Sequence, residues 1–373
     1  MMKLEEFAEI NMGQSPVSSS YNENEDGLPF FQGKADFGKI NPKAKVWCNK
    51  PTKIAEKDDI LMSVRAPVGD LNIATAKCCI GRGLAGIRAK KDKCYFKYLF
   101  YFLRSKYNEL NQMSTGSTFK AISKNNILNI EGNIPEIKEQ KIIVSKLDKF
   151  QDLIIKTEEQ IELLDDLIKS QFVEMFGSVK DSKWKKEKLE DITEKITDGK
   201  HGGCQSEYNS GYYFIGATEI YNDKINYENS NQITKKDFEK DYTRCDLKLD
   251  DFVIVNTGAT IGKSAIVVDE RCKNTLLQKS VALIRGKKEK ILPIYLKYCY
   301  EEEPSLYSKG QGCARINLLL SQIRNTDIPV PPIELQNKFA YFVKQIDKQK
   351  FEIQNELIEL KKVKEYLMNK YFN

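Results

Sequence analysis

The stretch IPEIKEQKII, residues 134–143, has a second version near the end of the chain, IPVPPIELQNKF, residues 328–339. Aligning IKEQ at 137–140 with IELQ at 333–336 gives an offset of 333 − 137 = 196 residues, which runs without a gap from Gly116 and Gly312 to Phe176 and Phe372. Upstream the match continues with small insertions, where DILMSVRAPVGDLNIA (59–74) aligns with DFVIVNTGATIGKSAIV (251–267). The chain is therefore an internal repeat in the order variable domain, helix, variable domain, helix.

Each copy ends in a long stretch with a single apolar seam. Apolar residues recur there at alternating steps of four and three, which is the heptad pattern of a coiled coil. Thr157 and Gln171 interrupt the first seam, and Lys350 and Lys364 interrupt the second. At 1.5 Å per residue, some forty residues form rods about 60 Å long. The residues predicted to pair the helices are Ile143, Leu147, Phe150, Ile154, Ile161, Leu164, Phe339, Val343, Ile346, Leu357 and Leu360.

A long helix with one apolar seam needs a partner, because an isolated helix would leave its apolar stripe in water. The simplest partner is the other copy. Residues 137–177 have a net charge of −3 and residues 333–373 a net charge of +2, so the two helices are electrostatically matched. The connection through a whole domain permits an antiparallel pair. The alternative is that each helix packs on its own domain.

The variable halves are punctuated by Gly, Pro, Asn and Asp between short β-branched runs, which predicts compact α/β units of about 135–150 residues. The fold class predicted is α+β, with two pseudo-symmetric α/β domains separated by an antiparallel two-helix coiled coil. Strands are expected at 59–64, 72–75, 252–255 and 265–268, and shorter helices at 96–108 and 293–301. The predicted bounds are 1–135 and 178–331 for the domains, and 136–177 and 332–373 for the helices.

Composition excludes several classes of function. The net charge of +6 is only a mild basic bias, compatible with DNA. Nine cysteines without a CxxC motif indicate reduced thiols rather than disulfides or zinc ribbons. A single histidine, His201, rules out histidine triads and histidine metal clusters. The chain has no apolar run that could span a membrane and no signal peptide, which predicts a cytoplasmic protein without a membrane partner.

Catalytic motifs are missing from the sequence. GATIGKS at 258–264 is one residue short of a phosphate-binding P-loop and is followed by a β-branched run, so a turn between two strands is the better interpretation. The only Pro-Pro, Pro331-Pro332, lacks the aromatic and polar neighbours of an adenine methyltransferase motif. No lysine follows Asp250-Asp251 in the spacing that a nuclease site needs. We therefore assign no catalytic residue.

Several motifs resemble those of the specificity subunits of type I restriction–modification enzymes. In the first copy they are SVRAPVGDLNIA (63–74), CCIGRGLAGIRA (78–89), GSTFKAISKNNILNI (116–130) and IPEIKEQKII (134–143). In the second copy they are TGATIGKSAI (257–266), QKSVALIRG (278–286) and IPVPPIELQNKF (328–339). The resemblance covers essentially the whole chain. It departs at Cys313-Ala314-Arg315, where GSTF would be expected.

The resemblance implies that each variable half is a target-recognition domain that reads one half of a bipartite site in double-stranded DNA. It also implies that the helices act as spacer and dock two methyltransferase subunits, and that a restriction and motor subunit joins the complex. The chain itself would hold no cofactor and no metal, since S-adenosylmethionine, ATP and Mg²⁺ belong to the partner subunits. The alternative function is a coiled-coil adaptor that does not read DNA.

Basic residues in glycine-containing loops are the physical candidates for DNA contacts, because such loops let the backbone approach phosphate. Some of them should instead read base edges in the major groove. The candidates are Lys34, Arg65, Arg82 and Lys120 in the first half, and Lys200, His201, Lys263, Lys279 and Arg315 in the second.

Overall fold

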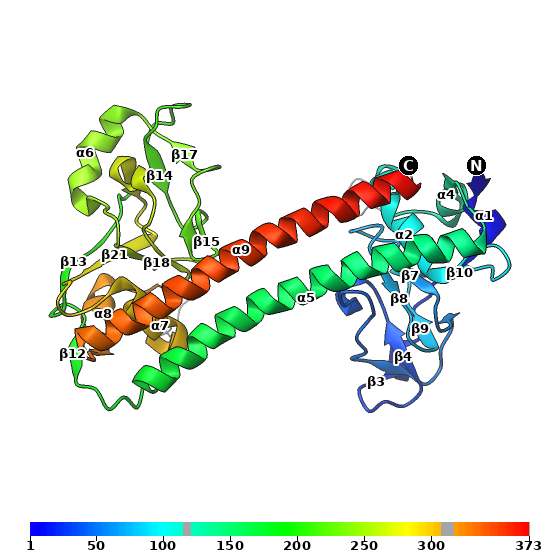
Figure 1. Cartoon of the computed structure of the whole chain (residues 1–373), viewed down its shortest axis with the longest axis horizontal. Helices are drawn as coiled ribbons and strands as arrows, with labels where there is room; N and C mark the ends of the chain where they lie inside the picture. The colour runs from blue at the N-terminus through cyan, green and yellow to red at the C-terminus, as the bar shows by residue number, and fades with distance from the viewer. Residues whose placement is uncertain (115–120, 307–316, 373) are drawn as a thin grey trace. The chain divides into compact units, whose positions relative to one another are not determined.

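The structure is a computed structural model that describes residues 1–114, 121–306 and 317–372. The chain divides into two units, one made of Met1–Glu159 with Gln354–Asn373 and the other of Gln160–Ile353. The two long helices, α5 (Ile137–Phe176) and α9 (Ile333–Phe372), are each continuous and contribute to both units (Figure 1). Both begin just after the prolines that precede them, where the missing N–H costs no hydrogen bond.

The first unit is built around an antiparallel sheet of β2, β10, β7 and β8, in that order. A second sheet, in which β4 and β9 run parallel, and the short pair β1–β11 complete it. The strands are β1 (Met2–Lys3), β2 (Ala8–Met12), β3 (Tyr21–Asn22), β4 (Leu28–Phe31), β5 (Trp47–Cys48), β6 (Ile54–Ala55), β7 (Ile60–Ser63), β8 (Leu71–Ile73), β9 (Cys78–Ile80), β10 (Leu84–Ala89) and β11 (Glu131–Gly132). The short helices are α1 (Leu4–Phe7), η1 (Ser18–Ser20), η2 (Lys34–Asp36), α2 (Phe96–Ser105), α3 (Tyr107–Gln112) and α4 (Lys124–Leu128).

The second unit repeats this topology. Its antiparallel sheet has the order β13, β21, β18 and β19, and β14 and β20 run parallel in a neighbouring sheet. The strands are β12 (Lys186–Lys188), β13 (Thr193–Asp198), β14 (Tyr213–Ile215), β15 (Ile220–Tyr221), β16 (Lys224–Ile225), β17 (Asn231–Gln232), β18 (Phe252–Val255), β19 (Ser264–Ile266), β20 (Thr275–Leu277), β21 (Val281–Gly286) and β22 (Asp327–Pro329). The helices are α6 (Lys235–Cys245), η3 (Glu270–Asn274), α7 (Pro293–Glu302), η4 (Pro304–Leu306) and α8 (Leu320–Arg324).

The predicted strands and short helices are present in the structure, within a few residues. Segment 258–264, which resembles a P-loop, forms the turn between β18 and β19. These two strands pair antiparallel, with Phe252 opposite Ile266. The interpretation of that segment as a turn is therefore confirmed. The second unit adds α6, a helix of eleven residues for which the first unit has no equivalent among its described residues. The two domains thus share a frame and differ in what is attached to it.

A buried glutamine at the start of each long helix explains part of the repeat. Gln140 has no exposed surface; its amide oxygen accepts from the Tyr95 N–H at 2.8 Å, and its amide nitrogen donates to the carbonyls of Lys93 and Pro135 at 2.9 and 2.7 Å. The counterpart Gln336 makes the same three bonds, each at 2.9 Å, with Leu292 N, Lys290 O and Pro331 O. A buried side-chain amide needs hydrogen-bond partners, and here all three partners are backbone groups at the helix start or in the adjoining domain. The glutamine therefore fixes the helix start to its domain.

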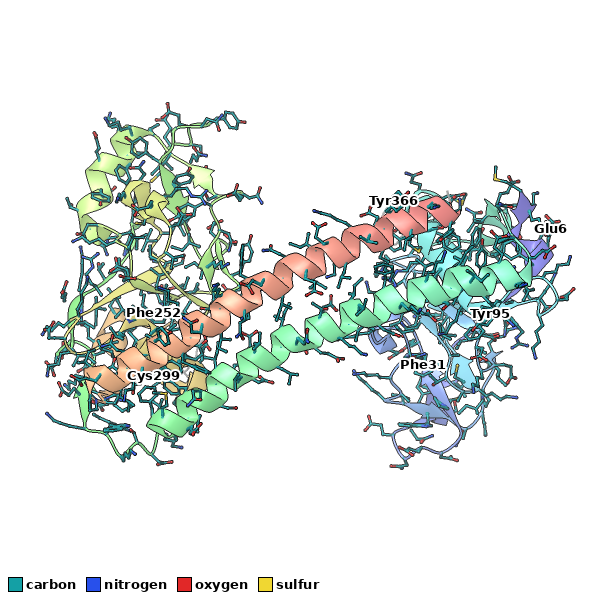
Figure 2. All side chains as sticks on the ribbon, in the orientation of Figure 1. Glu6, Phe31, Tyr95, Phe252, Cys299 and Tyr366 are labelled. Carbon is teal, nitrogen blue, oxygen red and sulfur yellow. The ribbon has the colours of Figure 1, made fainter. Side chains whose placement is uncertain are left out.

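The end of each long helix lies in the core of the unit built on the other copy of the repeat. Phe172 and Phe176, at the end of α5, pack against Tyr295 of α7 in the second unit, with ring centroids 5.6 and 4.8 Å apart. Phe372, the repeat counterpart of Phe176, packs against Tyr98 of α2 in the first unit at 5.1 Å. The core of the second unit also contains Phe252 and Cys299, which are labelled in Figure 2.

Eight of the nine cysteines lie among the described residues, and all eight are free thiols. Burial raises the pKa of Cys78, Cys94 and Cys245 to about 12, so these thiols stay protonated at neutral pH. Over the ranges that the structure describes, no group of side chains is arranged to hold a metal ion. In the same ranges, no helix is long and apolar enough to cross a membrane.

Candidate nucleic-acid interface

In the first domain, three loops that carry candidate residues meet at the carboxyl end of β7. Gly81 N–H donates to the Phe31 carbonyl at 2.8 Å, and Val64 N–H donates to the Gly83 carbonyl at 2.9 Å. A Cβ on Gly83 would collide with the backbone oxygen of Gln32, so this close approach requires glycine. The glycine loop therefore joins the other two segments. We call Lys34, Arg65 and Arg82 the first basic edge.

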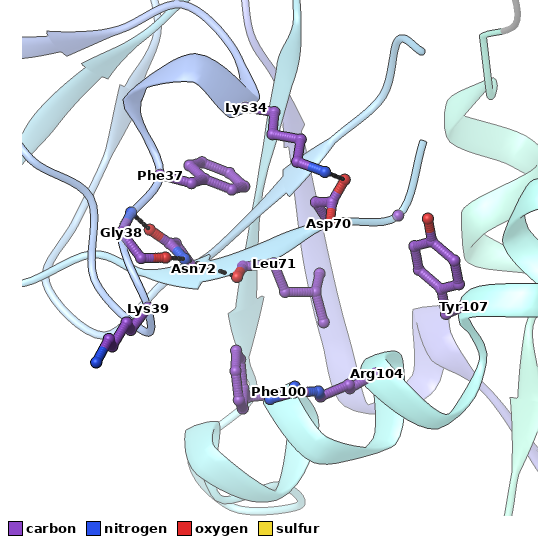
Figure 3. A pocket seen from close by; sticks show the side chains of 11 residues that line it. Lys34, Phe37, Gly38, Lys39, Asp70, Leu71, Asn72, Phe100, Arg104 and Tyr107 are labelled. Carbon is purple, nitrogen blue, oxygen red and sulfur yellow. Dashed lines mark hydrogen bonds and ion pairs between the residues drawn. The ribbon is translucent and has the colours of Figure 1, made fainter. Parts of the chain in front are cut away.

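The side chains of this edge differ in how free they are. Arg65 and Arg82 are exposed. Lys34 forms an ion pair with Asp70 at 2.9 Å, and this hydrogen bond raises the pKa of the lysine above its ordinary value (Figure 3). Lys120 lies outside the described residues. Arg65 and Arg82 are thus the cations of this edge best placed to meet DNA.

The second domain brings its candidates together in the same way, at the carboxyl end of β18. Lys279 N–H donates to the Lys200 carbonyl at 3.0 Å, and Asn256 N–H donates to the Ser280 carbonyl at 3.0 Å. The turn from β18 to β19 carries Lys263, whose carbonyl accepts from Val255 N–H at 2.7 Å. We call Lys200, His201, Lys263 and Lys279 the second basic edge.

Lys263 and Lys279 are exposed, and the His201 side chain is also exposed, with its Nε2 3.6 Å from a carboxylate oxygen of Asp198. Lys200 differs because its ammonium is paired with Asp241 of α6 and only 13% of its side chain is exposed. That hydrogen bond raises the pKa of Lys200. Lys200 therefore supports the loop more than it offers a free charge. Arg315 lies outside the described residues.

Arg82 and Lys279 occupy equivalent places in the two domains. Each lies in the loop just before the central strand, β10 or β21, and that strand's first residue accepts from a glycine N–H: Gly13 donates to Leu84 at 2.9 Å, and Gly199 to Val281 at 3.2 Å. Each domain therefore presents one exposed cation at the same point of the shared frame. All nine candidate DNA contacts stay predictions.

A cavity of about 440 Å³ lies beside the Lys34–Asp70 pair in the first unit (Figure 3). Its lining adds two cations that sequence reasoning missed, Lys39 and Arg104, together with Phe37 and Tyr107. The available signal was the tripeptide KIN, which occurs at 39–41 and again at 224–226. Its second version lines a cavity of about 210 Å³ in the second unit.

Helices α5 and α9 are in contact within each unit. In the first unit Lys146 Nζ lies 3.3 Å from Tyr371 Oη, and Glu158 forms an ion pair with Lys361 at 2.8 Å. Rising residue numbers in α5 thus meet falling numbers in α9, so the helices are antiparallel there. In the second unit Phe172 and Phe176 contact Phe339, with ring centroids 5.5 Å apart in both cases.

The predicted pairing residues are buried to different degrees. Those that join a domain core are buried, and most of the others are half-buried. Ile143 and Leu147 belong to the core of the first unit, and Phe339, Val343 and Ile346 to the core of the second. The half-buried residues are Phe150, Ile161, Leu164, Leu357 and Leu360, whereas Ile154 is buried. Packing on a neighbouring domain and packing between helices therefore coexist.

The lysines that interrupt the second seam have polar partners. Lys350 forms an ion pair with Asp165 in the second unit. Lys364 is buried in the first unit, where its ammonium contacts Gln151 and lies 5.7 Å from the centre of the Tyr101 ring. Burial and, to a smaller extent, the charge of Arg104 lower the pKa of Lys364 to about 8, against the opposing effect of Asp148.

Replacing Lys364 by methionine should stabilise the chain by about 1–3 kcal/mol at pH 7, because an apolar side chain of similar length avoids burying a charge. The unfolded chain keeps this proton up to about pH 10.4, whereas the folded chain loses it near pH 8. The stability that Lys364 contributes therefore rises as the pH increases between these values. Urea unfolding at pH 7 and at pH 9.5, which is about one unit below the unfolded pKa, measures the free energy of unfolding of the variant and of the unchanged chain. The difference between the two proteins should be smaller at the higher pH. A variant less stable at both values would contradict this account.

Comparison with known proteins identifies the family. The sequence-family model that describes the type I restriction modification DNA specificity domain matches the chain twice, over residues 1–164 and 181–362. The chain belongs to this family and carries two copies of its domain. The predicted resemblance is therefore confirmed.

Relatives described as type I restriction enzyme specificity subunits match the chain over different lengths. The MjaX specificity subunit of Methanocaldococcus jannaschii is 48% identical over 161 residues, which are 42% of this chain and only 38% of that relative. The MjaVIII specificity subunit of the same organism is 24% identical over 391 residues, 99% of this chain and 91% of the relative. The EcoBI specificity subunit of Escherichia coli is 21% identical over 92% of this chain and 78% of its own length.

A solved structure shows the same fold. The crystal structure of the S subunit of a type I restriction–modification system from M. genitalium matches with a TM-score of 0.55 at 16% identity, covering all of this chain and 95% of that one. The predicted fold class, with two mixed domains and two long helices, is confirmed.

Proposed function

We propose that this chain is the DNA-recognition subunit of a type I restriction–modification complex, with each domain reading one half of a bipartite site. The observation that carries the proposal is the equivalent placement of Arg82 and Lys279 on a shared frame whose surroundings differ. A shared frame gives both domains one way of docking on DNA, and unlike surroundings give two unlike half-sites. Linking two readers on one chain also raises affinity, because the second contact becomes intramolecular.

The long helices would dock two methyltransferase subunits. Both helices carry large apolar side chains on their exposed surfaces; Tyr366, for example, is 65% exposed (Figure 2). The exposed apolar residues are Ile142, Leu153, Leu163, Leu167 and Val173 on α5, and Tyr341, Phe351, Ile358, Val363 and Tyr366 on α9. Such side chains lose water when a partner helix covers them, which favours docking of another protein.

The chemistry would belong to the partners. Methyl transfer to adenine with S-adenosylmethionine would be performed by the methyltransferase subunits, and ATP and Mg²⁺ would serve a restriction and motor subunit. This chain would hold no cofactor, and the complex would act in the cytoplasm. The chain's contribution is then to select the DNA sequence at which the partners work.

Binding of the chain, assembled with its methyltransferase subunits, to the site identified by methylome sequencing tests this function. Arg82→Ala and Lys279→Ala should each weaken binding by about 1–3 kcal/mol if the side chain reads a base, and should relax specificity in one half-site only. If the side chain contacts phosphate instead, binding should weaken for all DNA sequences. The slope of the logarithm of the binding constant against the logarithm of salt concentration should then become smaller by about one.

The matched control is Lys288→Ala. Lys288 is an exposed lysine just beyond the other end of β21 from Lys279, so the variant removes the same charge away from the second basic edge. It should bind like the unchanged protein. Binding that is weak, insensitive to salt and blind to sequence would instead indicate an adaptor. Methyl transfer by the purified chain alone would also contradict the proposal.

A further inference from the structure

The two long helices carry opposite charges at one repeat position, and both charges are used between the helices. Asp165 of α5 corresponds to Lys361 of α9 at the 196-residue offset. Asp165 pairs with Lys350 of α9 in the second unit. Lys361 pairs with Glu158 of α5 at 2.8 Å in the first unit. Each contact therefore joins an acid of α5 to a base of α9.

Because the helices are copies of one repeat, each could also pair with its own kind from a second molecule. In an antiparallel α9–α9 pair of the same register, the place of Asp165 is taken by Lys361, so Lys350 would face Lys361. Two-fold symmetry would make this contact twice. Like charges at such close range repel, and these lysines would lie beside an apolar seam.

An α5–α5 pair meets the same difficulty with the opposite sign. The place of Lys361 is taken there by Asp165, so Glu158 would face Asp165 twice. The place of Lys350 is taken by Ile154, which leaves Asp165 without its cation. Only the unlike pair, α5 with α9, satisfies these charges.

We propose that the charge reversal at Asp165 and Lys361 selects pairing of α5 with α9 and excludes like-with-like pairing between two copies of this chain. The apolar residues alone do not discriminate, because the repeat places similar side chains on both seams. Charged residues at the edge of a coiled coil choose partners in this way, by repulsion in the wrong pair as well as attraction in the right one. The selection leaves α5 with α9 as the helix pair that these charges favour.

The test exchanges the charges in the full chain. In the double variant Asp165→Lys with Lys361→Asp, both α5–α9 contacts become repulsive, because the introduced lysine would face Lys350 and the introduced aspartate would face Glu158. Both like-with-like pairs become attractive. Light scattering after gel filtration should show the mass moving from 42.9 kDa toward twice that value as concentration rises.

Two further variants make the result specific. The control, Asp166→Lys with Lys362→Asp, exchanges the neighbouring repeat positions, whose ion pairs are with Lys169 and Glu359 of their own helices. It should keep the mass distribution of the unchanged chain. Adding Glu158→Lys and Lys350→Asp to the double variant restores attraction in both α5–α9 contacts and repulsion in both like pairs. This quadruple variant should return to the unchanged distribution.

A folded double variant with the mass distribution of the control would overturn the proposal. If the double variant fails to fold, as judged by its helix content, recovery in the quadruple variant supports the proposal, and equal failure of the quadruple variant overturns it. The measurement needs neither DNA nor a methyltransferase, so it is independent of the proposed recognition function.

Discussion

Arg285→Ala should lower the free energy of unfolding of the second domain by about 3–5 kcal/mol. The Arg285 guanidinium holds the Asp251 carboxylate with two bonds of 2.7 Å, and Asp251 is 1% exposed. The hydrogen bond to this carboxylate raises the pKa of Arg285, so the guanidinium stays charged. Removing the guanidinium leaves a buried carboxylate without its cation. Urea unfolding of the full chain, followed by hydrogen exchange in β18 and β21, measures the loss.

The repeat supplies a matched comparison. Arg88 binds Asp59 in the first domain with bonds of 2.7 and 2.8 Å, but 49% of the Arg88 side chain is exposed, against 14% for Arg285. Water can reach the first pair, so Arg88→Ala should cost roughly 1–2 kcal/mol. Equal losses in the two domains would show that burial does not set the energy of this pair.

Much of the frame could be predicted because the signals are local and repeated. Heptads bounded by proline placed α5 and α9 almost to the residue, and β-branched runs between turn residues located β7 and β18. Loop glycines marked the segments that meet at the first basic edge, since close backbone approach at Gly83 leaves no room for a side chain. These features depend on spacings of a few residues along the chain, and the same spacings recur in both copies of the repeat.

The remainder depends on partners that are distant in sequence. Nothing near Lys200 indicates that Asp241, 41 residues away on α6, takes up its charge. The packing of Phe176 against Tyr295 of the other copy is equally non-local. Lys350 and Lys364 looked like breaks in a seam, and only their contacts with Asp165 and Gln151 show them as part of it.

Leu164→Asp combined with Leu360→Asp should abolish recognition of the bipartite site. Both leucines are half-buried on the paired surfaces of α5 and α9. Two carboxylates placed on these surfaces would have to lose water for the helices to stay together, so the helices should separate. Separated readers lose the effective concentration that the spacer provides, and affinity should fall by about 10²–10⁴-fold, toward that of one domain.

The control replaces the same leucines by methionine, which keeps an apolar seam at a cost of less than about 1.5 kcal/mol. Each domain should keep its fold in both variants, because its central sheet and its buried glutamine, Gln140 or Gln336, are untouched. Hydrogen exchange in β10 and β21 reports that fold, while DNA binding of the assembled complex reports recognition. Full recognition by the aspartate variant would mean that the paired helices do not hold the readers at a fixed spacing.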